Sequence, residues 1–280
     1  MFKVVYLSGV TDRLLFRRSV AIGRILSKIM KVHLACLPMC RIFCLAAVLL
    51  SSKLFASELI FAYGAGNGAP FSIIKNGQLE SGLFKDIGEA LAEELGIPVS
   101  FKHAPHKRTS LLLSDGTINS ICMTHPDWIE GHEFLFWSDK IMEDFDHLIT
   151  RNSQSVIKNY EDIRGMNIGA MTGYIYFPEF MGQFHQGFAT RRDMNSLEAL
   201  YSSLFAHRID AVVDSLISVR YRKKIRKEYE PLGVSDLAVY RYDLYCAFSS
   251  SLKSMQFEIE SAIARMVKAG SFQQILNRYQ

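Results

Sequence analysis

The chain has 280 residues, of which 49% are apolar and 12% aromatic, with 7 Pro and 18 Gly. This composition excludes a disordered or low-complexity chain. The length allows one large domain or two smaller ones, each with a core of its own.

The formal charge of +4 is unevenly distributed along the chain. Residues 1–56 hold nine Lys or Arg and one acid, so the remainder holds 23 bases against 27 acids. A nucleic-acid-binding domain normally carries a basic face on its folded part, because neutralisation of phosphates supplies most of the affinity. We therefore expect no nucleic-acid partner.

The basic N-terminal region is typical of a secretion signal. An uncharged, largely apolar stretch runs over residues 42–52 and is followed by a small-residue cleavage site at Ala56. This stretch is long enough for a signal peptide but shorter than the roughly 20 residues of a membrane-spanning helix. We predict cleavage after Ala56, a periplasmic location, and Met30 or Met39 as the working initiator. Lys53 favours the alternative, an uncleaved anchor.

Two of the five cysteines, Cys122 and Cys246, follow this leader. Two cysteines are too few for a disulfide scaffold. Both lie in apolar, strand-like runs, where a buried free thiol is the commoner state. The sequence therefore favours two free thiols and leaves a disulfide between them as the alternative.

Strand and helix patterns alternate after the leader. A strand over 59–63 is followed by a glycine-rich turn and a short hairpin with Asn76-Gly77 at its turn. Apolar residues recur at helical spacing over 83–95, and a Gly and a Pro end this helix. A strand over 99–101 completes a βαβ unit, which implies a parallel sheet.

The rest of the chain repeats this alternation. The further predicted elements are, in chain order, a helix over 110–113, a strand over 118–123, a strand over 167–170, a helix that opens at Thr172-Gly173-Tyr174, a helix over 196–205, a strand over 209–213, and helices over 255–266 and 272–279. The sequence thus predicts two α/β blocks in series. The basic run over 220–227 is expected to be a solvated helix face, with a docking patch for a membrane partner as the alternative.

Five segments in this order carry a family pattern. They are Gly68-Ala69-Pro70-Phe71, the stretch over 76–96, Gly169-Ala170-Met171-Thr172-Gly173, Arg208-Ile209-Asp210-Ala211-Val212-Val213, and the stretch over 269–276. Together they resemble the bacterial periplasmic solute-binding proteins of the polar amino-acid uptake type. The resemblance covers about residues 58–280.

The resemblance implies an α/β fold of two lobes, the periplasmic binding protein type 2 fold, joined by two hinge strands with a ligand cleft between the lobes. Lobe 1 would comprise residues 58–149 plus 243–280, and lobe 2 residues 152–240. The hinges would lie near Thr150-Arg151 and Arg241-Tyr242. Hinge closure of this kind buries a small ligand between two rigid bodies.

The two charged residues that hold an amino acid in relatives have no counterpart in register. The position of the carboxylate-binding Arg falls on Gly131, and that of the amino-binding Asp falls on Ser215, one residue after Asp214. Bidentate recognition of a carboxylate by Arg is not reproduced by another residue type. The pattern therefore does not specify a standard α-amino acid as the ligand.

Three ligand-binding candidates come from lobe 1, and beside them the pair Lys107-Arg108, with Arg108 as the candidate, could supply the missing cation. Phe71 follows the first strand, as the ring that covers the ligand does in the family. Thr124 ends a strand, where relatives offer a hydroxyl. Trp128 lies in the next loop and could stack on a ring or a cation. The alternatives are core or loop packing for the two rings and a solvated loop for Arg108.

Four candidates come from lobe 2. Gly173, Tyr174 and Tyr176 lie at a predicted helix start, whose free N–H groups favour an anion. Either tyrosine could place a ring in the cleft, with packing onto neighbouring Phe residues as the alternative. Asp214 is the acid nearest to the position expected for the amino-binding Asp.

We expect a non-catalytic, monomeric receptor that closes on a small polar or amino-acid-like molecule and delivers it to an ABC importer in the inner membrane. Metal-binding His motifs, a Gly-x-Ser-x-Gly elbow and a Walker loop are absent from the sequence, so we predict no metal and no cofactor. One alternative is a periplasmic dehydratase-like enzyme with Asp127, Asp214 or Glu179 as general acid. Another is a ligand-sensing partner of a membrane receptor.

Overall fold

The computed structural model describes residues 57–64, 68–153 and 157–280. The predicted signal peptide lies outside these residues. The strands are β1 (Leu59–Tyr63), β2 (Ile73–Lys75), β3 (Gln78–Ser81), β4 (Val99–His103), β5 (Ser120–Thr124), β6 (Phe136–Trp137), β7 (Met142–Thr150), β8 (Asn167–Met171), β9 (Thr190–Met194), β10 (Ala211–Ser215) and β11 (Gly233–Phe248). The α-helices are α2 (Leu83–Leu95), α3 (Thr109–Ser114), α4 (Pro178–His185), α5 (Leu197–Phe205), α6 (Leu216–Ile225), α7 (Gln256–Lys268) and α8 (Ser271–Asn277). None of these helices is long and apolar enough to cross a bilayer.

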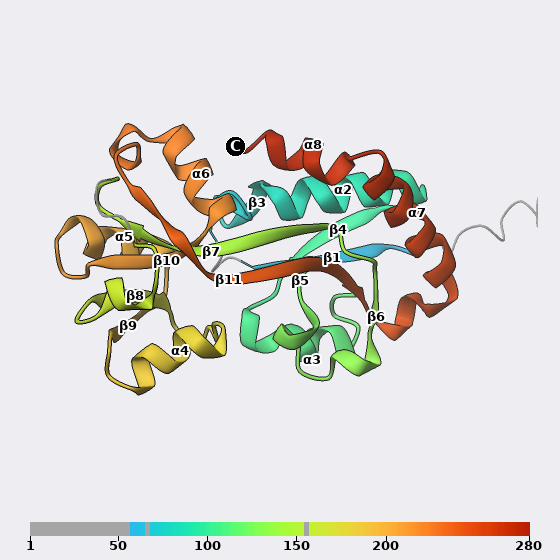
Figure 1. Ribbon diagram of the computed structural model, residues 1–280. Helices are drawn as coiled ribbons and strands as arrows, with labels where there is room; N and C mark the ends of the chain where they lie inside the picture. The colour runs from blue at the N-terminus through green and yellow to red at the C-terminus, as the bar shows by residue number, and fades with distance from the viewer. Residues whose placement is uncertain (1–56, 65–67, 154–156) are drawn as a thin grey trace, which may run out of the picture. The chain divides into compact units, whose positions relative to one another are not determined.

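The strands follow the order β4-β1-β5-β11-β7-β10-β8-β9, and β6 also pairs with β11. β1 is parallel to β4 and β5, and β8 is parallel to β9 and β10. The long strands β7 and β11 are antiparallel partners between these two parallel groups (Figure 1). Two α/β lobes joined by a pair of strands confirm the fold class predicted from the resemblance.

Lobe 1 is built around the amphipathic helix α2. Leu83, Ile87 and Leu91 are almost fully buried in its core. A Cβ at Gly88 would lie 2.7 Å from the ring of Phe101, so glycine lets α2 approach the sheet closely. Helices α7 and α8 pack against α2, which returns the end of the chain to lobe 1 (Figure 1).

Lobe 2 surrounds the parallel strands β8 and β10. Ile168 and Phe180 are fully buried on one side of this sheet, and Leu200 and Tyr201 on the other. The side chain of Ser196 accepts the N–H of Ala199 and caps α5, as expected for a Ser at a helix start.

The connecting strand β7 changes lobes before its C-terminal end. Met142 packs against the lobe 1 core, whereas Leu148 and Ile149 belong to the lobe 2 cores. Arg151 donates to the carbonyls of Leu204 and Ile209 in lobe 2. β7 therefore contributes to the cores of both lobes, and the hinge near Thr150-Arg151 stays a prediction.

Cys122 and Cys246 form a disulfide between the neighbouring strands β5 and β11. The prediction of two free thiols is wrong. Each thiol lies in an apolar strand, as expected, but the pairing of these strands is a tertiary contact across 124 residues.

The helix expected to open at Thr172-Gly173-Tyr174 begins later, at Pro178. Proline suits the first helical position because it lacks an N–H, and it keeps the preceding residue, Phe177, extended. Gly173 and Tyr174 therefore lie in a turn after β8, and the predicted anion site at a helix start is not present there.

Candidate functional site

A cavity of about 580 Å³ lies between the two lobes. Its lobe 1 wall comes from the segments that follow β1, β4 and β5, and its lobe 2 wall from those that follow β8 and β10. Ligands of open α/β sheets bind beyond the carboxyl ends of parallel strands, and this cavity has that position in both lobes. Residues of β7 and β11 also line it, so the connecting strands form part of the site.

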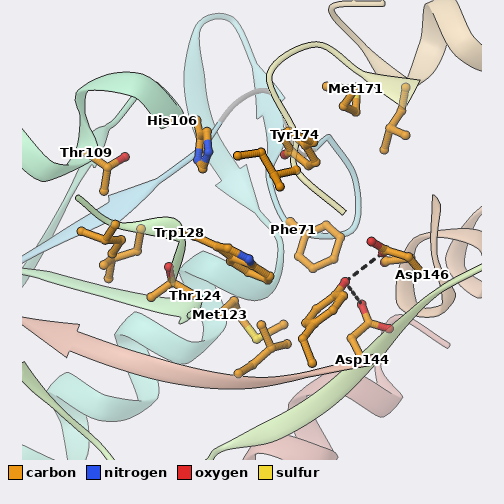
Figure 2. Close-up of a pocket in the computed structure, with 18 of the residues that line it drawn as sticks. Phe71, His106, Thr109, Met123, Thr124, Trp128, Asp144, Asp146, Met171 and Tyr174 are labelled. Atoms are coloured by element: carbon orange, nitrogen blue, oxygen red, sulfur yellow. Dashed lines mark hydrogen bonds between the residues drawn. The ribbon is translucent and has the colours of Figure 1, made fainter. Parts of the chain in front are cut away.

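Three of the predicted lobe 1 candidates line the cavity: Phe71, Thr124 and Trp128 (Figure 2). Phe71 and Thr124 are buried, and the ring of Trp128 meets that of Tyr242 edge-on at 5.0 Å. Arg108 is exposed and is not part of the lining, whereas its neighbours His106 and Lys107 are. Of the predicted pair Lys107-Arg108, only Lys107 lines the cavity.

The lobe 2 candidates also include residues that line the cavity and one that does not. Tyr174 and Tyr176 line the cavity, and Gly173 does not. The ring of Tyr174 lies 5.6 Å from that of His106, so the two lobes meet at this edge of the cavity. Burial and the nearby charge of Asp146 raise the pKa of Tyr174 to about 12. Tyr176 is buried, and its Oη accepts the N–H of Met171.

Asp214 lines the cavity but is engaged within lobe 2. Its Oδ2 accepts the hydroxyls of Tyr201 at 2.7 Å and Ser218 at 2.9 Å, and its Oδ1 accepts the N–H of Ser215. Arg222, in the basic run predicted to be solvated, is buried with its Nε 3.9 Å from Asp214 Oδ2. Burial raises the pKa of Asp214, and the Arg222 charge opposes this rise.

Two acids on β7 were not among the sequence candidates. Asp144 and Asp146 line the cavity, and the hydroxyl of Tyr242 on β11 donates to both, at 3.4 Å to Asp144 Oδ2 and 3.0 Å to Asp146 Oδ1 (Figure 2). Asp144 Oδ1 also accepts the N–H groups of Phe145 and, at the start of α6, Ile217. An Asp-x-Asp pair on a strand puts both carboxyls on one face. This spacing is the signal that could have found them.

Burial changes the acidity of this pair. It raises the pKa of Asp144 to about 6. The pKa of Asp146 is raised well above its usual value by burial and by the charge of Asp144. Two carboxyls close together in a poorly hydrated cavity resist simultaneous ionisation.

Of the two positions that the family pattern assigns to charged residues, only one lines the cavity. Gly131 is not part of the cavity lining, and its positive φ of 72° starts a turn. Ser215 lines the cavity, and its Oγ accepts the N–H of Ser218 as the cap of α6. Neither position therefore supplies an ionic contact for an α-amino acid.

Two α/β lobes joined by a pair of strands, with a cavity between the lobes, form the fold of two-lobed substrate-binding proteins. No family model and no curated protein sequence matches the chain significantly. Solved structures do match. The amino-acid ABC transporter substrate-binding protein AbpA from Streptococcus pneumoniae, bound to L-arginine, aligns with a TM-score of 0.63 at 16% identity, covering 82% of this chain and 95% of its own.

Two further structures have the same fold. The GluR0 ligand-binding core in complex with L-glutamate gives a TM-score of 0.65 at 14% identity, covering 79% of this chain and 97% of its own. An ancestral amino-acid-binding protein, described as a precursor of cyclohexadienyl dehydratase, gives 0.61 at 19% identity, covering 79% and 94%. Proteins with this fold thus differ in ligand and role.

Proposed function

We propose that this chain is an exported solute-binding protein that captures a small polar or amino-acid-like molecule by lobe closure and delivers it to an ABC importer. The observation that carries the proposal is the cavity of about 580 Å³ walled by both lobes and by their connecting strands. Its size is that of a small-molecule site. Rotation about a few residues of β7 and β11 would open and close it. The ABC-transporter protein with this fold supports the same role.

The ligand would contact Phe71, Thr124 and Trp128 from lobe 1 and Tyr174 and Tyr176 from lobe 2, with Asp214 beneath them. This set combines rings with a few polar groups, as small-molecule sites usually do. A permease in the inner membrane is the partner that this role requires, and we propose a monomer as its working form.

Export is part of the proposal. The disulfide between Cys122 and Cys246 supports it, because such bonds persist mainly in oxidising compartments such as the bacterial periplasm. A cleavable signal peptide that ends at Ala56 would provide the route.

The test begins with mass spectrometry of the solute that co-purifies with the full chain expressed for export. Thermal unfolding against a panel of solutes then identifies ligands, since a ligand that binds only the folded state raises Tm by mass action. Small-angle scattering with and without the ligand should show compaction. A protein that no solute stabilises or compacts, and that is retained in the cytosol, would contradict the proposal.

The cavity acids favour one second candidate, an enzyme that eliminates water from its ligand. Of the acids considered for this role, Asp127 and Glu179 do not line the cavity, whereas Asp214 does. Asp144, with its pKa raised to about 6, adds a carboxyl able to act as a general acid near neutral pH. Prolonged incubation with a bound solute distinguishes the two roles: a receptor returns the solute unchanged, and an enzyme releases a product of lower mass.

A further inference from the structure

The cavity wall carries more acidic than basic side chains. Asp144, Asp146 and Asp214 line it, whereas Lys107 is the one Lys or Arg in the lining that the structure describes. His106, the other basic residue there, has its pKa lowered by burial and by the charge of Lys107, so it is neutral near pH 7. Among the charged side chains that a ligand meets in this cavity, carboxyl groups therefore outnumber cations.

The three carboxyls differ in how far their hydrogen bonds are already satisfied. Asp214 accepts hydrogen bonds from the two hydroxyls and the backbone N–H described above, and it has the Arg222 guanidinium as an ion-pair partner. Asp146 has a single side-chain partner among the described residues, the hydroxyl of Tyr242. A carboxylate can accept about four hydrogen bonds, so Asp146 keeps most of its capacity for a ligand. Asp144 Oδ2 accepts a hydrogen bond from the same Tyr242 hydroxyl and can accept a further one from a ligand.

Aromatic rings line the cavity together with these two carboxyls. The hydroxyl of Tyr242 donates to both of them, and Tyr174 and Tyr176 line the same cavity from lobe 2. Phe71 and Trp128 line the same cavity from lobe 1 (Figure 2). A carboxylate among aromatic faces suits a desolvated organic cation, because ring faces attract positive charge.

Thr124 provides an independent sign of a ligand. It is 5% exposed and lines the cavity, and its hydroxyl makes no hydrogen bond to any described residue. Its oxygen remains accessible from the cavity, so it is available to a ligand. A metal ion is not favoured, because the described residues contain no group of three His, Cys, Asp or Glu side chains able to hold one.

We infer that the ligand is a small organic cation, an ammonium or guanidinium compound that needs no α-carboxylate, with its charged group held by Asp146 and Asp144 among the rings. This inference rests on the proposed function and names the ligand class of the same cavity. Thr124 accepts or donates a hydrogen bond at the lobe 1 wall. An Arg is the residue that usually binds the carboxylate of an amino-acid ligand, and the described lining contains none. The ligand therefore does not need a carboxylate.

The test compares amines with their carboxylated parents. The full-length protein, freed of co-purified solute by unfolding and refolding, is titrated calorimetrically with agmatine and arginine, cadaverine and lysine, and glutamate and glutamine. We expect agmatine or cadaverine to bind at least as tightly as its parent amino acid, and glutamate not to bind. Tighter binding of glutamate or glutamine than of every amine, with compaction, overturns the inference and leaves the proposed function intact. If none of the six binds, the inference is overturned, and absence of any co-purified solute then counts against the proposed function as well.

Two matched variants locate the cation. Asp146→Asn removes the charge in the cavity, and Glu143→Gln removes an acid from the same strand that is paired outside the cavity with Lys140 and Arg241. Loss of a charged hydrogen bond should weaken binding of the amine about tenfold to a hundredfold in Asp146→Asn, with no change in Glu143→Gln. Thermal unfolding confirms that both variants are folded. Unchanged amine affinity in folded Asp146→Asn overturns the inference.

Discussion

Asp144 is a buried acid whose ionisation opposes folding. Its pKa of about 6 in the folded protein lies above the ordinary value of 3.8, so the folded state holds the proton more tightly than the unfolded state does. Stability is therefore lost as pH rises from about 4 through 6. A pKa difference of about two corresponds to about 3 kcal/mol above that range. Burial is the main cause of this raised pKa and the charge of Asp214 adds to it, whereas hydrogen bonds from Phe145, Ser215 and Ile217 at the start of α6 oppose it.

We predict that Asp144→Asn stabilises the unliganded protein at pH 7.5 by about 1–3 kcal/mol and has little effect at pH 4. Asn keeps an oxygen for the N–H groups of Phe145 and Ile217 but cannot ionise. Urea unfolding at both pH values measures the difference. Glu143→Gln is the control, because the pKa of Glu143 is lowered by Arg241 and Lys140, and this variant should not gain stability as pH rises. An equal effect of Asp144→Asn at both pH values would contradict the explanation.

The site residues that were not predicted from the sequence, Asp144 among them, share one property: their role depends on which strands become neighbours. Asp144 and Tyr242 are paired across β7 and β11, nearly a hundred residues apart in the chain. Phe71 and Trp128, which follow strands, and Thr124, which ends β5, could be proposed because these strands are recognisable from their own sequence and match the family pattern. Arg222 is the opposite case. Its basic run predicted a solvated helix face, but its side chain is buried beside Asp214, a residue of another element.

At the scale of elements, regular amphipathic patterns were reliable. The predicted strand over 59–63 and the helix over 83–95 coincide with β1 and α2. β9 was missed because its exposed edge sequence, Thr-Arg-Arg-Asp-Met, has no apolar alternation and depends on pairing with β8. The start of α4 was placed too early because the decisive signal, Pro178, follows the glycine that the family pattern emphasised.

The disulfide is the covalent link between two of these elements. It closes a loop of 124 residues between β5 and β11, and a loop of that length corresponds to about 5 kcal/mol of unfolded-state entropy. We predict that a Cys122→Ala, Cys246→Ala double variant unfolds at a clearly lower urea concentration, with a loss of roughly 3–5 kcal/mol. The wild-type protein under a reducing agent should show a similar loss. If both unfold at the midpoint of the oxidised protein, the link does not stabilise the fold.

At the scale of the whole substrate-binding fold, contacts between the lobes should act only when the cavity is closed. His106 follows β4 in lobe 1 and Tyr174 follows β8 in lobe 2, and their rings lie 5.6 Å apart at the edge of the cavity. Aromatic pairs of this kind contribute about 0.5–1.5 kcal/mol. If the lobes separate before the ligand leaves, this contact must break first, so it should slow dissociation.

We therefore predict that Tyr174→Ala and His106→Ala each speed dissociation of the tightest-binding amine, and that their effects are not additive. The coupling energy in a double-mutant cycle should be about 0.5–1.5 kcal/mol. Stopped-flow dissociation measures the rates. Phe205→Ala is the control, because Phe205 packs on Tyr229 within lobe 2, away from the cavity lining, so it should change stability but not dissociation. Strictly additive effects would mean that each ring acts on the ligand alone, and that contact between the lobes does not retain it.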